Sequence, residues 1–274
     1  MGGTPLQHLT NAGIQASEAV KLYDEGQHQV YWVGIQGGGE EIECNTYLVV
    51  DGGDGFLIEP GGYDRYTAVL SKVNQVMNAM KITHLLVSHQ DPDLCASIPA
   101  WLRTNNKIKV VLPSQWTRFI PHYMDYNVSQ VAGANLSFLP VSDEGVALPL
   151  KSGGQIRCIS APYLHSPGNI VMHDTASGFL FSGDIGAAVH KDGRLRLVIE
   201  DWAQQAVAMQ GFHQRYMSSN RAVSGFLRKL DGIPITALLP QHGSIFRGDE
   251  VGKFFRWLEQ LPVGVDYLYG AGKA

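Results

Sequence analysis

An apolar run that ends in alternating histidine and aspartate constrains this chain more than any other feature. Residues 82–88 read as a buried strand, and His89, Asp91 and Asp93 follow directly after it. Because alternate residues of an extended segment point the same way, these three side chains should converge. They would lie at the carboxyl end of the strand, where open α/β sheets usually place their functional sites.

Three more potential metal ligands stand in turn-like settings after later apolar runs. They are His165, Asp184 and His242. Six histidine and carboxylate donors, each placed just after a predicted strand, predict a site for two metal ions. Alone, each histidine is more simply a surface or hydrogen-bonded residue, and Asp93 is also suited to cap the helix that follows it. Their joint setting favours the metal site.

The rest of the chain alternates predicted strands and helices in two similar halves. Strands at 29–36, 45–50 and 55–59, separated by glycine-rich and Asp-Gly turns, predict an antiparallel meander. Helices are predicted near 64–79, 93–103, 201–218, 220–230 and 248–260, and further strands near 82–87, 108–112, 136–140, 146–149, 155–160, 169–174, 178–182 and 235–239. Strands followed by helices, twice over, predict two packed sheets with helices outside. No low-complexity linker divides the chain, so we expect one domain over residues 1–274.

Composition argues against several classes of function. Of the 274 residues, 45% are hydrophobic, which is enough for a substantial core, and the net charge of −4 provides no basic surface for nucleic acid or anionic lipid. No apolar stretch approaches the roughly 20 residues of a membrane span, and the first residues lack the features of a signal peptide. We therefore expect a cytoplasmic protein. Cys44, Cys95 and Cys158 have no paired spacing and are expected to be buried apolar residues.

This order of motifs resembles the metallo-β-lactamase superfamily over roughly residues 28–262. The resemblance implies a four-layer αβ/βα sandwich with a metal site at one edge of its two sheets. Many hydrolases of the superfamily carry His-x-His-x-Asp-His, whereas Asp91 stands at the third position here. In this respect the chain is similar to the flavodiiron proteins and to the stand-alone oxygen-binding diiron proteins. The segments 165–169 and 180–184 also look like that group's third-ligand loop and bridging-aspartate strand.

The resemblance implies a ligand set and a function. One iron would be held by His89, Asp91 and His165, the other by Asp93 and His242, with Asp184 bridging. On independent chemical grounds, a carboxylate in place of an imidazole favours iron over zinc. The implied protein is a non-haem diiron protein that binds O2, or NO, and acts as an oxygen sensor or as a scavenger that reduces it.

Two departures from the family pattern affect this interpretation. Leu94 stands where a histidine normally follows the second aspartate, so the second iron is one protein ligand short. The flavodoxin-like domain that carries FMN in flavodiiron proteins has no counterpart before the chain ends at Ala274, so we expect no FMN here. Electrons, or a signal, would then pass through a separate donor or signalling protein. The resemblance also implies a homodimer, although the flavin-delivery reason for pairing is absent.

Two other classes of function stay open. The first is a zinc-dependent dinuclear hydrolase, in which metal-bound hydroxide attacks an ester, thioester or phosphodiester. Asp91 counts against it. The second is a pure binding module that reports its ligand state to a partner protein, and the lack of a flavin domain favours this over an autonomous oxidoreductase.

Other aromatic and histidine residues receive simpler interpretations. The segment 211–217 is most simply a packed face of a helix, but Tyr216 or His213 could instead reach the metal pocket, where a phenol is a suitable hydrogen-bond donor to dioxygen. The remaining histidines are given no direct role. His84 and His173 are expected to be packed or exposed within strands, and no convergent partners are expected for His8, His28, His122 and His190.

Overall fold

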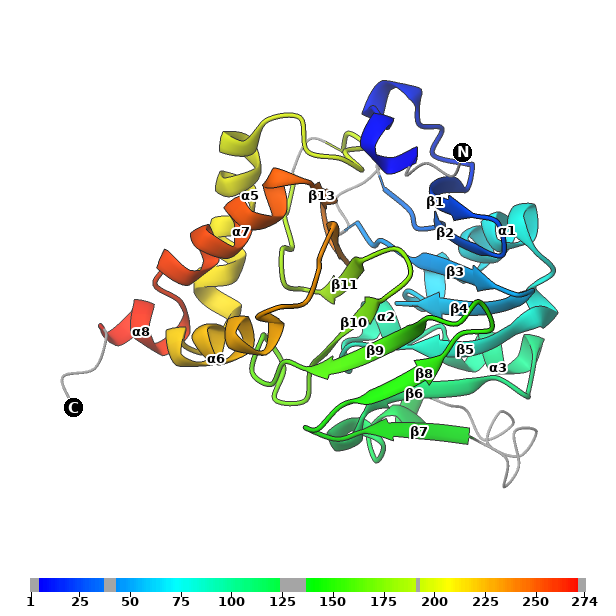
Figure 1. Ribbon diagram of the computed structural model, residues 1–274. Helices are drawn as coiled ribbons and strands as arrows, with labels where there is room; N and C mark the ends of the chain where they lie inside the picture. The colour runs from blue at the N-terminus through cyan, green and yellow to red at the C-terminus, as the bar shows by residue number, and fades with distance from the viewer. Residues whose placement is uncertain (1–4, 37–42, 124–136, 191–192, 271–274) are drawn as a thin grey trace.

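Two mixed β-sheets pack face to face and carry helices on their outer faces (Figure 1). The computed structural model describes residues 5–36, 43–123, 137–190 and 193–270. Within these residues the arrangement is the four-layer αβ/βα sandwich that the order of motifs predicted.

The first sheet joins an antiparallel meander to a parallel half. Its strands follow one another in space as in sequence: β1 (Val20–Glu25), β2 (His28–Trp32), β3 (Tyr47–Asp51), β4 (Asp54–Ile58), β5 (Ile82–Leu86), β6 (Lys109–Pro113) and β7 (Ser137–Val141). Neighbours from β1 to β4 are antiparallel, whereas those from β4 to β7 are parallel. The carboxyl ends of the parallel strands therefore meet at one edge, and β5 leads directly to His89.

The second sheet contains one parallel pair among antiparallel neighbours. Its order is β13 (Phe246–Arg247), β12 (Ala237–Pro240), β11 (Phe179–Gly183), β10 (Ile170–Asp174), β9 (Gln155–Ser160) and β8 (Val146–Pro149). Only β11 and β12 run parallel among these pairs. Asp184 follows the first of them and His242 the second, so both residues leave the sheet at the same edge.

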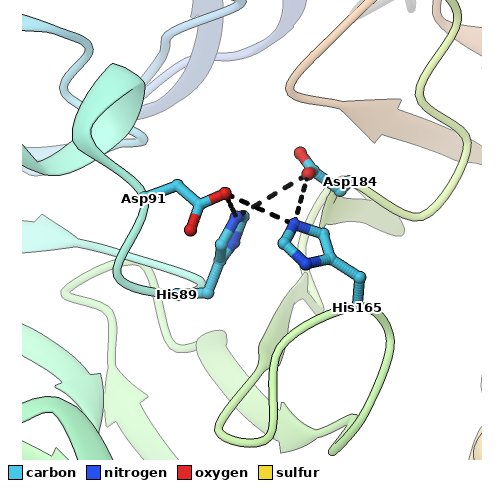
Figure 2. A group of neighbouring side chains, drawn as sticks. All are labelled: His89, Asp91, His165 and Asp184. Carbon is cyan, nitrogen blue, oxygen red and sulfur yellow. Dashed lines mark ion pairs between the residues drawn. The ribbon is translucent and has the colours of Figure 1, made fainter. Parts of the chain in front are cut away.

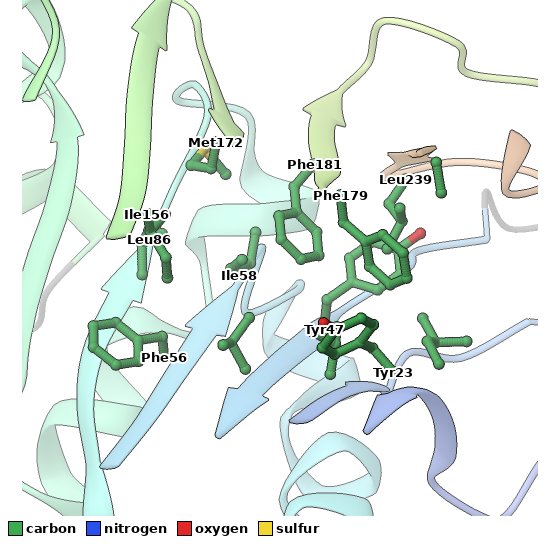
Figure 3. Packing of buried hydrophobic residues seen from close by; sticks show 14 of the residues in the cluster. Tyr23, Tyr47, Phe56, Ile58, Leu86, Ile156, Met172, Phe179, Phe181 and Leu239 are labelled. Carbon is green, nitrogen blue, oxygen red and sulfur yellow. The ribbon is translucent and has the colours of Figure 1, made fainter. Parts of the chain in front are cut away.

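Apolar residues from both sheets form the central core. Tyr47 of β3 meets Phe181 of β11 with ring centroids 5.3 Å apart, and Tyr23 meets Phe179 edge-on at 5.8 Å (Figure 3). Such aromatic pairs add to the stability gained by burying their surface. The core therefore fixes how the two sheets lie on each other, and with that the position of the edge that both share.

Helices cover the outer face of each sheet through separate apolar clusters. The first sheet is covered by α1 (Tyr66–Val76) and α3 (Ile98–Thr104), and the second by α5 (Trp202–Tyr216), α6 (Asn220–Leu230) and α7 (Asp249–Gln260). Figure 1 shows α8 (Gly264–Tyr269) beyond α6 and α7. The short helical turns are η1 (Pro5–His8), η2 (Asn11–Gly13), η3 (Tyr63–Arg65), η4 (Ala79–Lys81), η5 (Ser114–Trp116) and η6 (Ile120–Tyr123). In the described part of the chain, no helix has the length and apolarity that crossing a membrane requires.

The helix predicted over 93–103 is two helices. It divides into α2 (Pro92–Cys95) and α3, and the Ser97 hydroxyl between them donates to the carbonyl of Pro60 over 3.0 Å. Pro99 has no N–H to donate to the preceding turn, which favours a new helix start there. The sequence interpretation also missed β1, β13 and α8, which are short or amphipathic.

Candidate metal centre

The six predicted ligands lie together at the shared edge of the two sheets, although they come from distant parts of the chain. They follow different strands or lie in different loops: His89, Asp91 and Asp93 after β5, His165 between β9 and β10, Asp184 after β11, and His242 after β12. Each sheet therefore contributes half of the set.

Four of these side chains form a first cluster (Figure 2). His89 Nε2 lies 3.6 Å from Asp91 Oδ2 and 3.7 Å from Asp184 Oδ2. His165 Nε2 lies 3.5 Å from Asp91 Oδ2 and 2.9 Å from Asp184 Oδ2. The donor atoms all lie within 4.8 Å of one another, so one cation can be surrounded by them.

A second cluster adjoins the first through Asp184. His242 Nε2 lies 3.2 Å from Asp93 Oδ2 and 3.5 Å from Asp184 Oδ1. Cys44 Sγ, Asp93 and His242 again have donor atoms within 4.8 Å of one another. The two oxygens of Asp184 thus face different clusters, which is the arrangement of a carboxylate that can bridge two cations.

Hydrogen bonds hold two of the histidines so that Nε2 faces the site. His89 Nδ1 is 2.8 Å from Ser88 Oγ, and His242 Nδ1 is 2.5 Å from the backbone carbonyl of Glu43, to which it donates. Metal-binding histidines commonly donate their other ring N–H in this way, which fixes the tautomer and the ring orientation. The sequence analysis did not identify Glu43 or Ser88 in this role.

Two buried atoms at the site lack hydrogen-bond partners among the described residues. They are His89 Nε2 and Asp184 Oδ1. Buried polar atoms are seldom left without partners, because their desolvation is then not offset. Both atoms point toward other potential ligands, so the donor set fits a bound cation at each cluster.

Charges within the site shift the pKa values of its members strongly. Burial would raise the pKa of Asp184, but the charges of His89 and His242 hold it well below its usual value. Burial would lower the pKa of His89, but the negative charges of Asp184 and Asp91 raise it to about 9. A protonated His89 therefore balances part of the carboxylate charge in the metal-free protein, and an entering cation would displace its proton.

Glu59 is a buried carboxyl group close to His89 of the first cluster. Its side chain is 2% exposed, and Oε2 accepts a hydrogen bond from the Ser88 N–H over 3.3 Å. Burial raises its pKa to about 7, against the opposing effect of His89. Glu59 thus supports the backbone next to a predicted ligand. The sequence did not indicate a role for Glu59, because no predicted metal ligand follows β4.

An aromatic pair from α5 borders the first cluster. The ring of Tyr216 lies 5.7 Å from that of His165 and stacks on Phe212 at 4.7 Å, and Tyr216 is 55% exposed. His213 has a different role, since Nε2 accepts from the Gly186 N–H and Nδ1 bonds the Met209 carbonyl. His213 therefore anchors the loop after Asp184 and does not face the cluster.

Three sequence interpretations need correction or extension. Asp93 is not a helix cap, because α2 begins at Pro92 and Asp93 lies inside it. His28 does have convergent partners, since its ring bonds Asp51 Oδ1 at 3.0 Å and Asp174 Oδ2 at 2.7 Å. All three cysteines are buried, as predicted, but Cys44 lies at the second cluster, which its position in the sequence did not indicate.

Comparisons with known proteins show the family of this chain. The family model described as "ODP family beta lactamase" matches residues 42–243. A solved structure described as "Peroxy diiron species of chemotaxis sensor ODP" has a TM-score of 0.80 and 33% identity, covering 92% of this chain and 98% of that chain. The apo state of chemotaxis sensor ODP from T. denticola also has a TM-score of 0.80, with 35% identity over 92% of this chain and 97% of that chain.

A curated relative is more distant. Diflavin flavoprotein A 1 of Synechocystis sp. (strain ATCC 27184 / PCC 6803 / Kazusa) is 23% identical over 233 residues, which are 82% of this chain and 38% of that protein. This chain therefore spans well under half of that relative's length. The family model spans most of this chain and includes all six predicted ligands, and two solved structures exceed 30% identity over nearly their whole length. The chain belongs to the ODP family of β-lactamase-fold proteins.

Proposed function

We propose that this protein holds two iron ions, binds O2 and acts as an oxygen sensor. The observation that carries the proposal is the division of the two Asp184 oxygens between two clusters of donor atoms. The related structure described as a peroxy diiron species of a chemotaxis sensor supports iron and O2 as the occupants. The same relative favours sensing over reduction.

The ligand assignment follows the two clusters. The first iron would be held by His89, Asp91 and His165 and the second by Asp93 and His242, with Asp184 available as a ligand to both. Asp91 makes the first position harder and more negative than a site of three imidazoles, which favours iron in its +2 and +3 states over zinc. Bound ferrous ions would supply the electrons that O2 accepts when it binds.

The protein's own groups prepare the site for this chemistry. The hydrogen bonds of His89 to Ser88 and of His242 to Glu43 keep both Nε2 atoms directed inward. Asp184 stays ionised, because neighbouring charges lower its pKa. Pre-oriented ligands reduce the reorganisation that metal binding requires, so the site is suited to capture metal without a large change in the fold.

Signalling would require a separate partner, and reduction would require a separate electron donor. The chemotaxis role of the related sensor supports a signalling partner. A cytoplasmic location stays a prediction from the sequence. NO is a second diatomic ligand that the same site could hold. Homodimer formation stays a prediction from the family resemblance.

Tyr216 is proposed to donate a hydrogen bond to O2 at the site. Two observations support this role: its ring lies 5.7 Å from that of His165, and the residue is 55% exposed. Replacing Tyr216 by Phe keeps the ring and its stacking on Phe212 but removes the hydroxyl. The variant should bind O2 more weakly or lose it faster in stopped-flow absorbance. An unchanged affinity and decay rate would contradict the role of the hydroxyl.

The central test is the metal content of protein made in iron-replete, zinc-poor cells and purified without air. Wild-type protein should hold nearly two irons per chain, and titration with O2 should change its visible absorption in proportion to iron. Asp184→Asn should lose both irons. Asp51→Asn is the matched control, because Asp51 is equally buried but bonds His28 at another place in the fold.

Two outcomes would reject the proposal. Stoichiometric zinc under these conditions would favour the hydrolase, and hydrolysis of a thioester or phosphodiester would then be measured. Full iron content in Asp184→Asn would show that Asp184 does not bridge. A stable oxygenated form would support sensing, whereas rapid repeated turnover with an added electron donor would support reduction.

A further inference from the structure

Cys44 lies at the second cluster, where the family pattern is one ligand short. Its Sγ donates a weak hydrogen bond to Asp93 Oδ2 over 3.9 Å. Leu94 occupies the position of the missing histidine, and its fully buried side chain packs in the apolar cluster under α1 and α3. We propose that Cys44 supplies a thiolate ligand to the second metal ion, an inference that rests on the two-metal site proposed above.

The distances suit coordination by one small cation. A tetrahedral ion with a sulfur ligand at about 2.3 Å and nitrogen or oxygen ligands at about 2.1 Å separates its donor atoms by roughly 3.4–3.6 Å. Asp93 Oδ2 lies 3.9 Å from Cys44 Sγ and 3.2 Å from His242 Nε2. Movements of a few tenths of an ångström would bring these atoms to the required spacing.

The backbone holds Cys44 firmly against the turn that carries His242. Cys44 forms both hydrogen bonds of an antiparallel bridge with Ile35, at 3.0 and 3.2 Å. The preceding residue, Glu43, accepts the Nδ1–H of His242, and the N–H of the following residue, Asn45, donates to the Gln241 carbonyl over 2.6 Å. These backbone contacts fix the main chain of residues 43–45 beside the second cluster, and with it the point from which the thiol extends.

An independent observation also points to a ligand at this position. Asp184 is 4% exposed, and its Oδ1, which faces His242, has no hydrogen-bond partner among the described residues. A metal ion would satisfy this oxygen together with Asp93, His242 and Cys44, which makes four donors. On binding, the Sγ–H bond breaks, a sulfur–metal bond forms and the proton passes to solvent, with no change in oxidation state.

The thiolate would make the two metal positions chemically different. The first has only nitrogen and oxygen ligands, while the second would combine these with a softer sulfur, which zinc and other thiophilic ions prefer. The simpler alternative is that Cys44 only donates a hydrogen bond to Asp93. The two readings differ in whether sulfur touches the metal, which spectroscopy detects directly.

The test is anaerobic titration of the metal-free, full-length protein with Co²⁺, followed by absorbance and by direct metal analysis. Wild-type protein should bind two Co²⁺ ions, with a near-ultraviolet thiolate-to-cobalt charge-transfer band that grows with one of them. Cys44→Ser should lose the band and bind that ion roughly 100-fold more weakly. Cys44→His, which restores a nitrogen ligand, should bind two ions without the band. Cys158→Ala is the control and should match wild type, because Cys158 is buried in β9, away from both clusters.

Each remaining outcome has a distinct meaning. Two bound Co²⁺ ions without the band in wild-type protein would reject the thiolate while leaving the two-metal site intact. A band that persists in both Cys44 variants would assign the sulfur to another cysteine. Failure of the wild-type protein to bind Co²⁺ at all would reject the two-metal site itself.

Discussion

Replacing Asn45 by alanine should destabilise the edge of the sandwich at which the predicted ligands meet. Asn45 is fully buried. Its Oδ1 accepts hydrogen bonds from Trp32 Nε1 at 2.8 Å and from Gln36 Nε2 at 2.9 Å. Its Nδ2 donates to the carbonyls of Pro240 at 2.9 Å and of Gly243 at 2.8 Å. One side chain thus connects the first sheet to the turn that carries His242.

The expected loss of stability follows from which partners keep another hydrogen bond. Gln36 Nε2 also donates to the Gly243 carbonyl over 2.9 Å, and the Pro240 carbonyl also accepts from the Tyr47 hydroxyl over 2.8 Å. Within the described residues, Trp32 Nε1 alone would be left without a partner. One orphaned buried donor costs about 1–3 kcal/mol and each of the other three bonds about 0.5–1.5 kcal/mol, for a total of about 2.5–7.5 kcal/mol. At about 2 °C per kcal/mol for a chain of this size, Tm should fall by roughly 5–15 °C.

The assay is thermal unfolding of the metal-free protein, so that metal binding does not contribute to Tm. Asn105→Ala is the matched control, since Asn105 Nδ2 donates to the carbonyls of Met80 and Ile82, both at 3.0 Å, at the opposite end of β5 from His89. Both variants should melt earlier, but only Asn45→Ala should also weaken metal binding. A Tm within about 2 °C of wild type for Asn45→Ala would refute the hydrogen-bond reasoning.

Three further predictions concern pH and metal. Burial would lower the pKa of His28, but Asp174 and Asp51 outweigh this effect and raise its pKa above the usual value. Protonated His28 therefore makes its full contribution to stability below about pH 6.5, and this contribution is lost as pH rises through the raised pKa. The difference in unfolding free energy between wild type and His28→Gln should therefore shrink above that pH, and a difference that grows would contradict the assignment. Burial lowers the pKa of His84 to about 4, so the unfolding free energy of the wild type should fall as pH drops from about 6.5 to 4. His84→Phe keeps a ring stacked on Phe56 and should remove the contribution of His84 to this fall. An equal dependence of the unfolding free energy on pH in both proteins would contradict this. Removing metal with a chelator should lower the unfolding free energy by about 3 kcal/mol if the free metal had been about 100 times its Kd, and an unchanged Tm would mean that the folded state does not bind metal under those conditions.

The sheets and the convergence of the six candidate ligands at one edge were predictable, because their signals are local. Apolar runs with turn residues between them marked most strands, and each candidate ligand lies in the connection that follows a strand. The clearest signal came from His89, Asp91 and Asp93. Alternate residues of an extended segment point the same way, so these side chains converge if the chain stays extended for a few residues after the strand. The ends of helices were less well predicted, as at α3, where Pro99 in the first turn marks the start of a separate helix.

The features that sequence reasoning missed depend on contacts between distant segments. His28 meets Asp174 across 146 positions, and His242 meets the Glu43 carbonyl across 199. Neither the bridge that places Cys44 at the second cluster nor the burial of Glu59 leaves a local pattern. These contacts follow from how one sheet lies on the other, which is decided by the central core and not by any short motif.

The division of the ligands between the two sheets has a mechanical consequence. His89, Asp91 and Asp93 belong to one sheet, while His165, Asp184 and His242 belong to the other. Ions bound by these residues would therefore cross-link layers that are otherwise joined by apolar packing and hydrogen bonds. Loading the site should slow amide hydrogen exchange on β5, β11 and β12 together, because opening either sheet at this edge would require breaking metal–ligand bonds. A change in the ligands of one ion would alter contacts in both sheets at once. The outer helices pack on these sheets, so their positions at the protein surface would change as well.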